Sequence, residues 1–155
     1  MKLFIRISIA VLIPLALLMS AYVLRGNYLS PEQKLMGEWK EVSWTYEKAD
    51  NKGSVNFNDE PISEAMKHMI SRSKIIHQAE TWSFTADSGL VLNTQHKRLN
   101  VNWALMGSSN ILRLKYNDEF EEHYNLVELS EKQMVLHFEN DNLTRGIVKI
   151  IFEKI

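Results

Sequence analysis

The side chains in this sequence that could carry out chemistry are histidines and carboxylates, because the chain contains no cysteine. The lack of cysteine removes disulfides, thiolate metal sites and cysteine nucleophiles from consideration. The sequence has no phosphate-binding loop and no Gly-x-Ser-x-Gly or His-Glu-x-x-His motif, and no serine or threonine stands in a recognisable catalytic setting. The histidines are spread along the chain, at His68, His77, His96, His123 and His137. We therefore expect a protein that is not an enzyme and needs no cofactor.

Two of these histidines could still meet across a predicted hairpin. If the segments 120–128 and 133–139 pair around a three-residue turn, two histidines and two carboxylates lie together on the outer face, with His123 opposite His137 and Glu121 opposite Glu139. Such a group can hold zinc. Polar side chains on the solvated face of a hairpin are the ordinary alternative, so we expect no metal site.

The same pairing directs Glu122 inward, between Phe120 and Tyr124. A carboxylate among apolar neighbours is costly to bury without a partner. Glu122 is therefore expected either to reach solvent at the rim or to bind a polar or cationic group of a ligand.

The elements that must position these side chains are mainly strands. Apolar and polar residues alternate in many short segments, for example at 99–105, 112–116 and 134–138. Turn-forming residues separate these segments at intervals of roughly ten residues. This spacing predicts seven or eight short antiparallel strands in a barrel or a sandwich.

One segment has helical periodicity instead. Its apolar residues recur at i, i+3, i+4, i+7 and i+8, at Ile62, Ala65, Met66, Met69 and Ile70. The pattern predicts an amphipathic helix over residues 62–76 with this stripe buried. A second, much shorter helix is expected to begin near Ser30-Pro31 and to end before Gly37.

The N-terminus carries an uncharged run from Ile7 to Leu24, preceded by Lys2 and Arg6. The run is long enough to cross a bilayer as a helix, and the flanking charges favour a domain outside the cytoplasm. A cleaved signal peptide is the alternative. We predict a transmembrane anchor or uncleaved signal over residues 1–25.

The start of the first strand, Leu35-Met36-Gly37-Glu38-Trp39, resembles the Gly-x-Trp signature of lipocalins and their bacterial lipocalin-like relatives. Three later segments, at 81–84, 124–136 and 150–154, are similar to later strands of those relatives. The resemblance implies an all-β fold, an eight-stranded antiparallel up-and-down barrel over residues 37–155. A tether and short helix over residues 26–36 would precede it, and the helix at 62–76 would lie across its open end as a lid.

In that family the tryptophan closes the bottom of the barrel, and an arginine from the last strand usually lies across it. This chain departs from the pattern, because Lys154 stands nearest that position. We expect Trp39 to be buried and to pack against the Lys154 ammonium in a cation–π contact.

The resemblance implies a binding module for a small, mainly apolar ligand. With the anchor predicted from the N-terminal run, we expect this module on the outer (periplasmic) side of a bacterial inner membrane. The ligand-binding residues we predict lie on the lid helix and inside the barrel: Met66, Met69, Trp82, Phe84, Trp103, Glu122 and Tyr124. The alternative is a filled barrel that acts as an interaction subunit with a protein partner in the cell envelope. A net charge of −1 gives no basic surface for nucleic acid.

Overall fold

The computed structural model describes residues 29–48, 60–140 and 146–155. The chain divides into two compact units, Met1–Ser30 and Pro31–Ile155, and the second contains the elements described below. The predicted anchor at residues 1–25 lies outside the described residues. Within the described ranges, no helix combines the length and the apolar character needed to cross a membrane.

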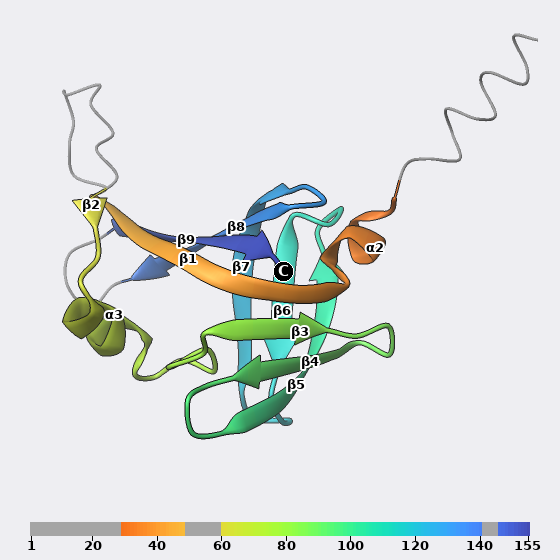
Figure 1. The fold of residues 1–155 in the computed structure, drawn as a ribbon, viewed down its shortest axis with the longest axis horizontal. Helices are drawn as coiled ribbons and strands as arrows, with labels where there is room; N and C mark the ends of the chain where they lie inside the picture. Colours follow the sequence, from red (N-terminus) through yellow and green to blue (C-terminus); the bar gives the residue numbers. More distant parts are fainter. Residues whose placement is uncertain (1–28, 49–59, 141–145) are drawn as a thin grey trace, which may run out of the picture. The chain divides into compact units, whose positions relative to one another are not determined.

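The second unit is built on one antiparallel sheet that closes on itself (Figure 1). Its strands are β1 (Gly37–Lys48), β2 (Glu60–Pro61), β3 (Thr81–Phe84), β4 (Gly89–Asn93), β5 (Arg98–Met106), β6 (Ile111–Lys115), β7 (Glu121–Leu129), β8 (Gln133–Asn140) and β9 (Gly146–Lys154). Strands β3 to β8 each pair with the next strand in sequence, and β1 pairs with both β3 and β9. The short β2 pairs only with β1, so the closed barrel has eight strands, as predicted.

The strands direct alternate side chains into the barrel, and these side chains fill its interior. Strands β3 and β4, for example, bury every second residue, which places Trp82, Phe84, Leu90 and Leu92 inside. This period of two is the one that a pleated strand imposes on its two faces. Strand β9 buries alternate residues throughout most of its length, ending at Phe152.

One end of the barrel, the floor, is closed by the short helix α2 (Pro31–Leu35) and the first residues of β1. Trp39 is fully buried there, and its indole N–H donates a hydrogen bond of 2.7 Å to the carbonyl of Leu35. The Lys154 ammonium lies 5.0 Å from the centre of the Trp39 ring. The predicted contact between these two residues is confirmed.

Gly37 makes this close packing feasible. Its φ is +111°, a region that side-chain-bearing residues rarely adopt, and a Cβ there would lie 2.9 Å from Cε of Lys154. The glycine therefore lets the chain turn from α2 into β1 directly beneath the lysine stem.

The predicted helix at 62–76 is shorter than expected. Helix α3 spans Glu64–Ser71, begins where the Ser63 hydroxyl accepts the Met66 N–H, and ends where residues 72–78 fold into successive turns. Of the predicted buried stripe only Ile70 is buried; Ile62 is half-buried, and Ala65, Met66 and Met69 are exposed. The prediction of one long helix with a buried stripe is wrong. The buried apolar contacts are made after the helix instead, by Ile76 and Ala79.

The predicted register of the hairpin between β7 and β8 is also wrong. Leu126 pairs with Leu136, and an irregularity at Val127 shifts the pairing so that Leu129 lies opposite Met134. The turn is set by Ser130, whose N–H donates to the Gln133 carbonyl and whose hydroxyl accepts the Gln133 N–H. The turn places Ser130 opposite Gln133, and the bulge offsets the pairing further along the strands. His137 therefore lies opposite Asn125 and not opposite His123.

As a consequence, the four residues of the zinc alternative are not brought together. His123 lies opposite Arg113 and contacts Glu121 at 3.1 Å, whereas His137 lies opposite Asn125. Within the described ranges, no group of three or more histidines and carboxylates has the arrangement of a metal site.

Candidate functional site

Four of the predicted ligand-binding residues form part of an aromatic core inside the barrel. Trp82, Phe84, Trp103 and Tyr124 are each at most 6% exposed. The Trp82 ring lies 4.8 Å from Phe152, 6.3 Å from Phe84 and 6.4 Å from Tyr124, measured between ring centres. Phe84 and Trp103 pack edge to face at 5.6 Å. Such edge-to-face packing is a favourable arrangement for aromatic rings, and it fills the centre of the barrel with protein.

Glu122 lies half-buried at the opposite end of the barrel from α2. It accepts a hydrogen bond of 2.6 Å from the Tyr124 hydroxyl, and both its carboxylate oxygens lie 3.1 Å from the backbone nitrogen of Ile75. Burial and the adjacent Glu122 carboxylate raise the pKa of Tyr124 well above its ordinary value, so the phenol keeps its proton and remains a donor. Glu122 thus fixes residue 75 against strand β7.

Met66 and Met69 lie on the exposed surface of α3, 38% and 53% exposed. The helix is held to the barrel through its other side, where the Lys67 ammonium forms a salt bridge with Glu41 of β1. Lys67 also lies 5.4 Å from the centre of the Trp44 ring. The two methionines are therefore far more exposed than the aromatic residues predicted to share a site with them.

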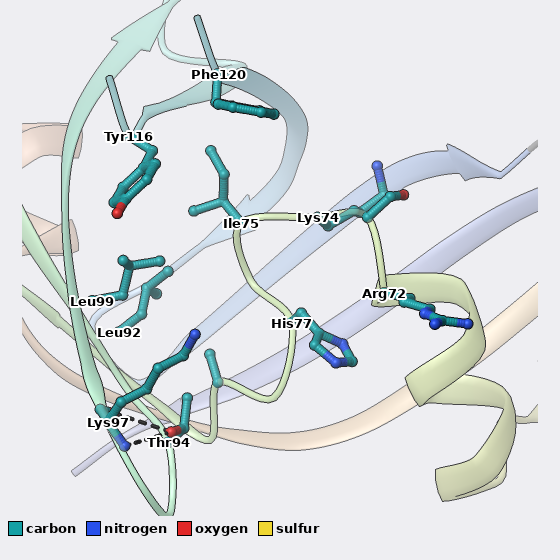
Figure 2. Close-up of a pocket in the computed structure, with 12 residues that line it drawn as sticks. Arg72, Lys74, Ile75, His77, Leu92, Thr94, Lys97, Leu99, Tyr116 and Phe120 are labelled. Carbon is teal, nitrogen blue, oxygen red and sulfur yellow. Dashed lines mark hydrogen bonds between the residues drawn. The ribbon is translucent and has the colours of Figure 1, made fainter. Parts of the chain in front are cut away.

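A cavity with a mainly apolar lining lies at the end of the barrel opposite α2, where three segments come together (Figure 2). The first is residues 72–79, which we call the covering segment. The other two are the β4–β5 connection and the β6–β7 connection. The cavity, which we call the mouth pocket, has a volume of about 350 Å³. Its apolar wall consists of Ile75, Ala79, Leu92, Leu99, Tyr116 and Phe120.

The covering segment is held in place over this end of the barrel. Its turns are closed by backbone hydrogen bonds from Lys74 to Ser71, from His77 to Lys74 and from Ala79 to Ile76, at 2.8 to 3.1 Å. Ile76 and Ala79 are 2% and 1% exposed. Together with the bonds from Glu122 to Ile75, these contacts give the pocket one preformed wall.

The polar lining of the mouth pocket is basic. Arg72, Lys74, His77 and Lys97 line it, and its described lining contains no Asp or Glu. Burial lowers the pKa of His77, and the neighbouring charges of His68, Lys97 and Arg72 lower it further. The His77 Nδ1 atom lies 2.9 Å from the Ser71 hydroxyl, which fixes the ring against α3.

None of the seven predicted ligand-binding residues lines this pocket. The sequence did not predict the pocket, because most of its lining comes from the connections between strands and only Leu92 and Leu99 come from strands. A signal was present in the β6–β7 connection, where Tyr116 and Phe120 bracket the polar residues 117–119. Both rings are about half exposed, at 48% and 56%, and large apolar groups left in water next to a cavity often mark a binding site.

A closed eight-stranded up-and-down barrel with a tryptophan at its floor defines the class of barrel proteins to which lipocalins belong. Residues 35–136 match the family described as the lipocalin-like domain. The chain belongs to this family, so binding of a small hydrophobic molecule is the function that its fold suggests.

Comparison with solved structures gives distant matches. A lipocalin-like protein from Bacteroides uniformis is 14% identical, with 79% of this chain and 99% of that chain covered and a TM-score of 0.46. The bovine lipocalin allergen Bos d 2 is 16% identical over 82% of this chain and 76% of its own, with a TM-score of 0.45. A complex of bovine odorant-binding protein with undecanal is 13% identical over 79% and 72%, with a TM-score of 0.41. The comparison with curated proteins gives no match.

Proposed function

We propose that this protein binds a small, mainly apolar molecule and that the mouth pocket holds it. The observation that carries the proposal is the apolar wall of that pocket beside the exposed rings of Tyr116 and Phe120. A volume of about 350 Å³ falls in the lower part of the usual range for small-molecule sites, about 300–1,000 Å³. Covering the two rings with a ligand would remove apolar surface from water, which is favourable.

The aromatic core argues for the mouth rather than the centre of the barrel. A ligand at the centre would have to displace rings that are packed at 4.8 to 6.4 Å from one another. Protein interiors are packed as densely as organic crystals, so such a displacement requires rearrangement of several side chains at once. A ligand at the mouth needs no such rearrangement.

We further propose that residues 1–25 anchor the barrel to the outer face of a bacterial cytoplasmic membrane. The support is the uncharged run after Lys2 and Arg6. After carbonate washing the protein should stay in the membrane fraction, and its barrel should be cut by a protease added to spheroplasts. Recovery of a soluble form shortened at its N-terminus would instead identify a cleaved signal peptide.

A role as an interaction subunit is the second candidate, and the exposed methionines of α3 are the observation that favours it. Flexible, polarisable methionines are common at protein-binding surfaces. The two functions differ in what the purified protein should bind.

Isothermal titration calorimetry of the full chain in phosphatidylcholine nanodiscs, with octanol as the neutral apolar probe, tests the first function. Empty nanodiscs provide the reference. We expect saturable heat with one site per chain, weakened by Leu99→Asp, which places a charge in the apolar wall. Heat equal to that of empty nanodiscs would contradict the binding function and favour the interaction subunit.

A further inference from the structure

We infer that the ligand of the mouth pocket is an anionic amphiphile, an apolar chain with one negatively charged head group, and that Lys97 and His77 receive the head group. This inference rests on the proposed function and specifies its ligand class. It follows from the separation of the lining into an apolar wall and a basic rim.

The basic rim is a local feature of the pocket. The whole chain carries 18 Lys and Arg residues against 19 Asp and Glu residues, whereas the described lining of the pocket holds Arg72, Lys74 and Lys97, with His77, and no Asp or Glu. The carboxylate bonded to the covering segment, Glu122, is held by the Ile75 N–H and the Tyr124 hydroxyl and does not line the pocket.

Lys97 is the basic residue best placed to meet a ligand. Its ammonium forms no salt bridge with any described residue, and Figure 2 shows its side chain extending toward the space between Leu92 and His77. The backbone that carries it is fixed, because the Thr94 hydroxyl accepts the Lys97 N–H and donates to the Lys97 carbonyl, both at 3.0 Å. A charged donor on a fixed backbone turn needs less ordering to bind an anion than one on an unrestrained loop.

His77 supplies the second donor from the opposite wall. The depressed pKa of its imidazole arises from burial and from the positive charges around it. A negative head group placed among these charges would relieve their mutual repulsion and favour the protonated ring. By contrast, Figure 2 shows the Arg72 guanidinium pointing away from the pocket, and Lys74 lies 4.8 Å from the centre of the Phe138 ring. Arg72 and Lys74 therefore attract the head group through their positive charges without contacting it.

The apolar chain would run from this head-group position across Leu92 and Leu99 toward Tyr116 and Phe120. All four residues line the same pocket, and the two aromatic rings are the most exposed part of its apolar wall. A neutral apolar molecule would fill the same wall but leave the Lys97 ammonium without a partner. Charge-assisted hydrogen bonds are about twice as strong as neutral ones, so the head group should decide between ligands of equal chain length.

The test compares octanoate with octanol by calorimetry, using the full chain in phosphatidylcholine nanodiscs. We expect octanoate to bind about tenfold more tightly, a ratio that corresponds to about 1.4 kcal/mol. Lys97→Gln should weaken octanoate binding much more than octanol binding, so that the ratio of the two affinities falls several-fold toward one. The matched control is Arg98→Gln, since Arg98 is the adjacent exposed basic residue outside the pocket lining, and it should preserve the tenfold ratio.

The outcomes separate the two proposals. Equal binding of octanoate and octanol to the wild-type protein would overturn the anionic head group and leave the apolar binding function standing. Binding of neither molecule would overturn both. Nanodiscs that contain phosphatidylglycerol distinguish the source of the head group. If this lipid competes with octanoate in the wild-type protein but not in Lys97→Gln, the anionic amphiphile is a membrane lipid. If it does not compete, the amphiphile is a free molecule.

Discussion

The Lys154 ammonium lies 5.0 Å from the centre of the Trp39 ring and donates a hydrogen bond of 2.8 Å to the backbone carbonyl of Lys34. One side chain from the last strand thus contacts both the first strand and the helix that precedes it. Because β1 and β9 are the strands whose pairing closes the barrel, this contact ties the two ends of the sheet together at the floor.

Removing the floor tryptophan should therefore destabilise the barrel strongly. Trp39→Ala is expected to lower the free energy of unfolding by about 3–5 kcal/mol, through lost burial and the cavity left behind. Lys154→Met keeps most of the stem and should lose the cation–π contact, about 0.5–2 kcal/mol, together with the hydrogen bond to the Lys34 carbonyl. Urea unfolding followed by tryptophan fluorescence measures both, with the exposed Lys132→Met as the control. A loss below about 1 kcal/mol for Trp39→Ala would mean that the floor is not part of the stabilising core.

The salt bridge between Glu41 and Lys67 should be costly to break from one side. The Glu41 side chain is only 6% exposed, and Lys67→Met would leave its carboxylate buried without a partner, at a cost of about 3–5 kcal/mol near neutral pH. The double variant Glu41→Leu with Lys67→Met should recover most of that loss, since both charges are then gone. A double variant as unstable as Lys67→Met would show that the carboxylate is not the cause.

The same variant should acquire a distinctive pH dependence. Burial raises the pKa of Glu41 even with Lys67 present, and removing the lysine takes away its hydrogen bond and its positive charge, the two strongest interactions that oppose the rise. An acid with a raised pKa in the folded state binds more protons there than in the unfolded chain. Stability of Lys67→Met should therefore be highest in acid and fall as the pH rises above the usual carboxyl range near 4.5. Thermal unfolding measured across that range checks the sign, and an increase of stability with pH would contradict it.

Glu122 should control how firmly the covering segment is held. Glu122→Ala removes the acceptor of the Ile75 N–H and of the Tyr124 hydroxyl. Hydrogen bonds to charged groups contribute about 1.5–3 kcal/mol, so the Ile75 amide should exchange with solvent roughly ten to a hundred times faster. The exposed Glu119→Ala is the matched control and should leave the Ile75 rate unchanged. Equal rates in Glu122→Ala and wild type would mean that the segment is held by its apolar contacts alone.

The anionic ligand should bind more tightly as the pH falls. The pKa of His77 lies below its usual value because burial, His68, Lys97 and Arg72 all disfavour its charged form. A bound anion favours that form, so binding takes up a proton and the octanoate affinity should rise several-fold from about pH 7.5 to about pH 5.5. His77→Gln should make the octanoate affinity nearly independent of pH. If the affinity of this variant still changes with pH as in the wild type, another group takes up the proton, and His68 is the nearest one.

The barrel and its floor could be predicted from the sequence because both depend on local patterns. Alternation with a period of two marks each strand, and the Gly37-x-Trp39 spacing places a large ring beside the turn into β1. The strands were predictable in this way, whereas the closed barrel of eight strands, the burial of Trp39 and its lysine partner followed from the resemblance to lipocalins.

The mouth pocket could not be predicted in the same way, because its position depends on where three connections meet. The bulge at Val127 and the turn at Ser130 changed the register of β7 and β8, and neither has a periodic signal. The end of α3 at Ser71 likewise depends on turns closed by Lys74, His77 and Ala79. Met66 and Met69 showed helical spacing, but the spacing alone did not reveal that Ile70 is the only buried residue of the predicted stripe and that Ile76 and Ala79 supply further buried contacts after the helix.

The most direct test of the account is a map of backbone amide chemical shifts, recorded by NMR on the full chain in phosphatidylcholine nanodiscs during titration with octanol. The account predicts that the shifted amides cluster in residues 74–79, 92–99 and 116–120, the segments that line the mouth pocket. Shifts concentrated at Trp82, Trp103 and Tyr124 would place the ligand inside the barrel and contradict the account.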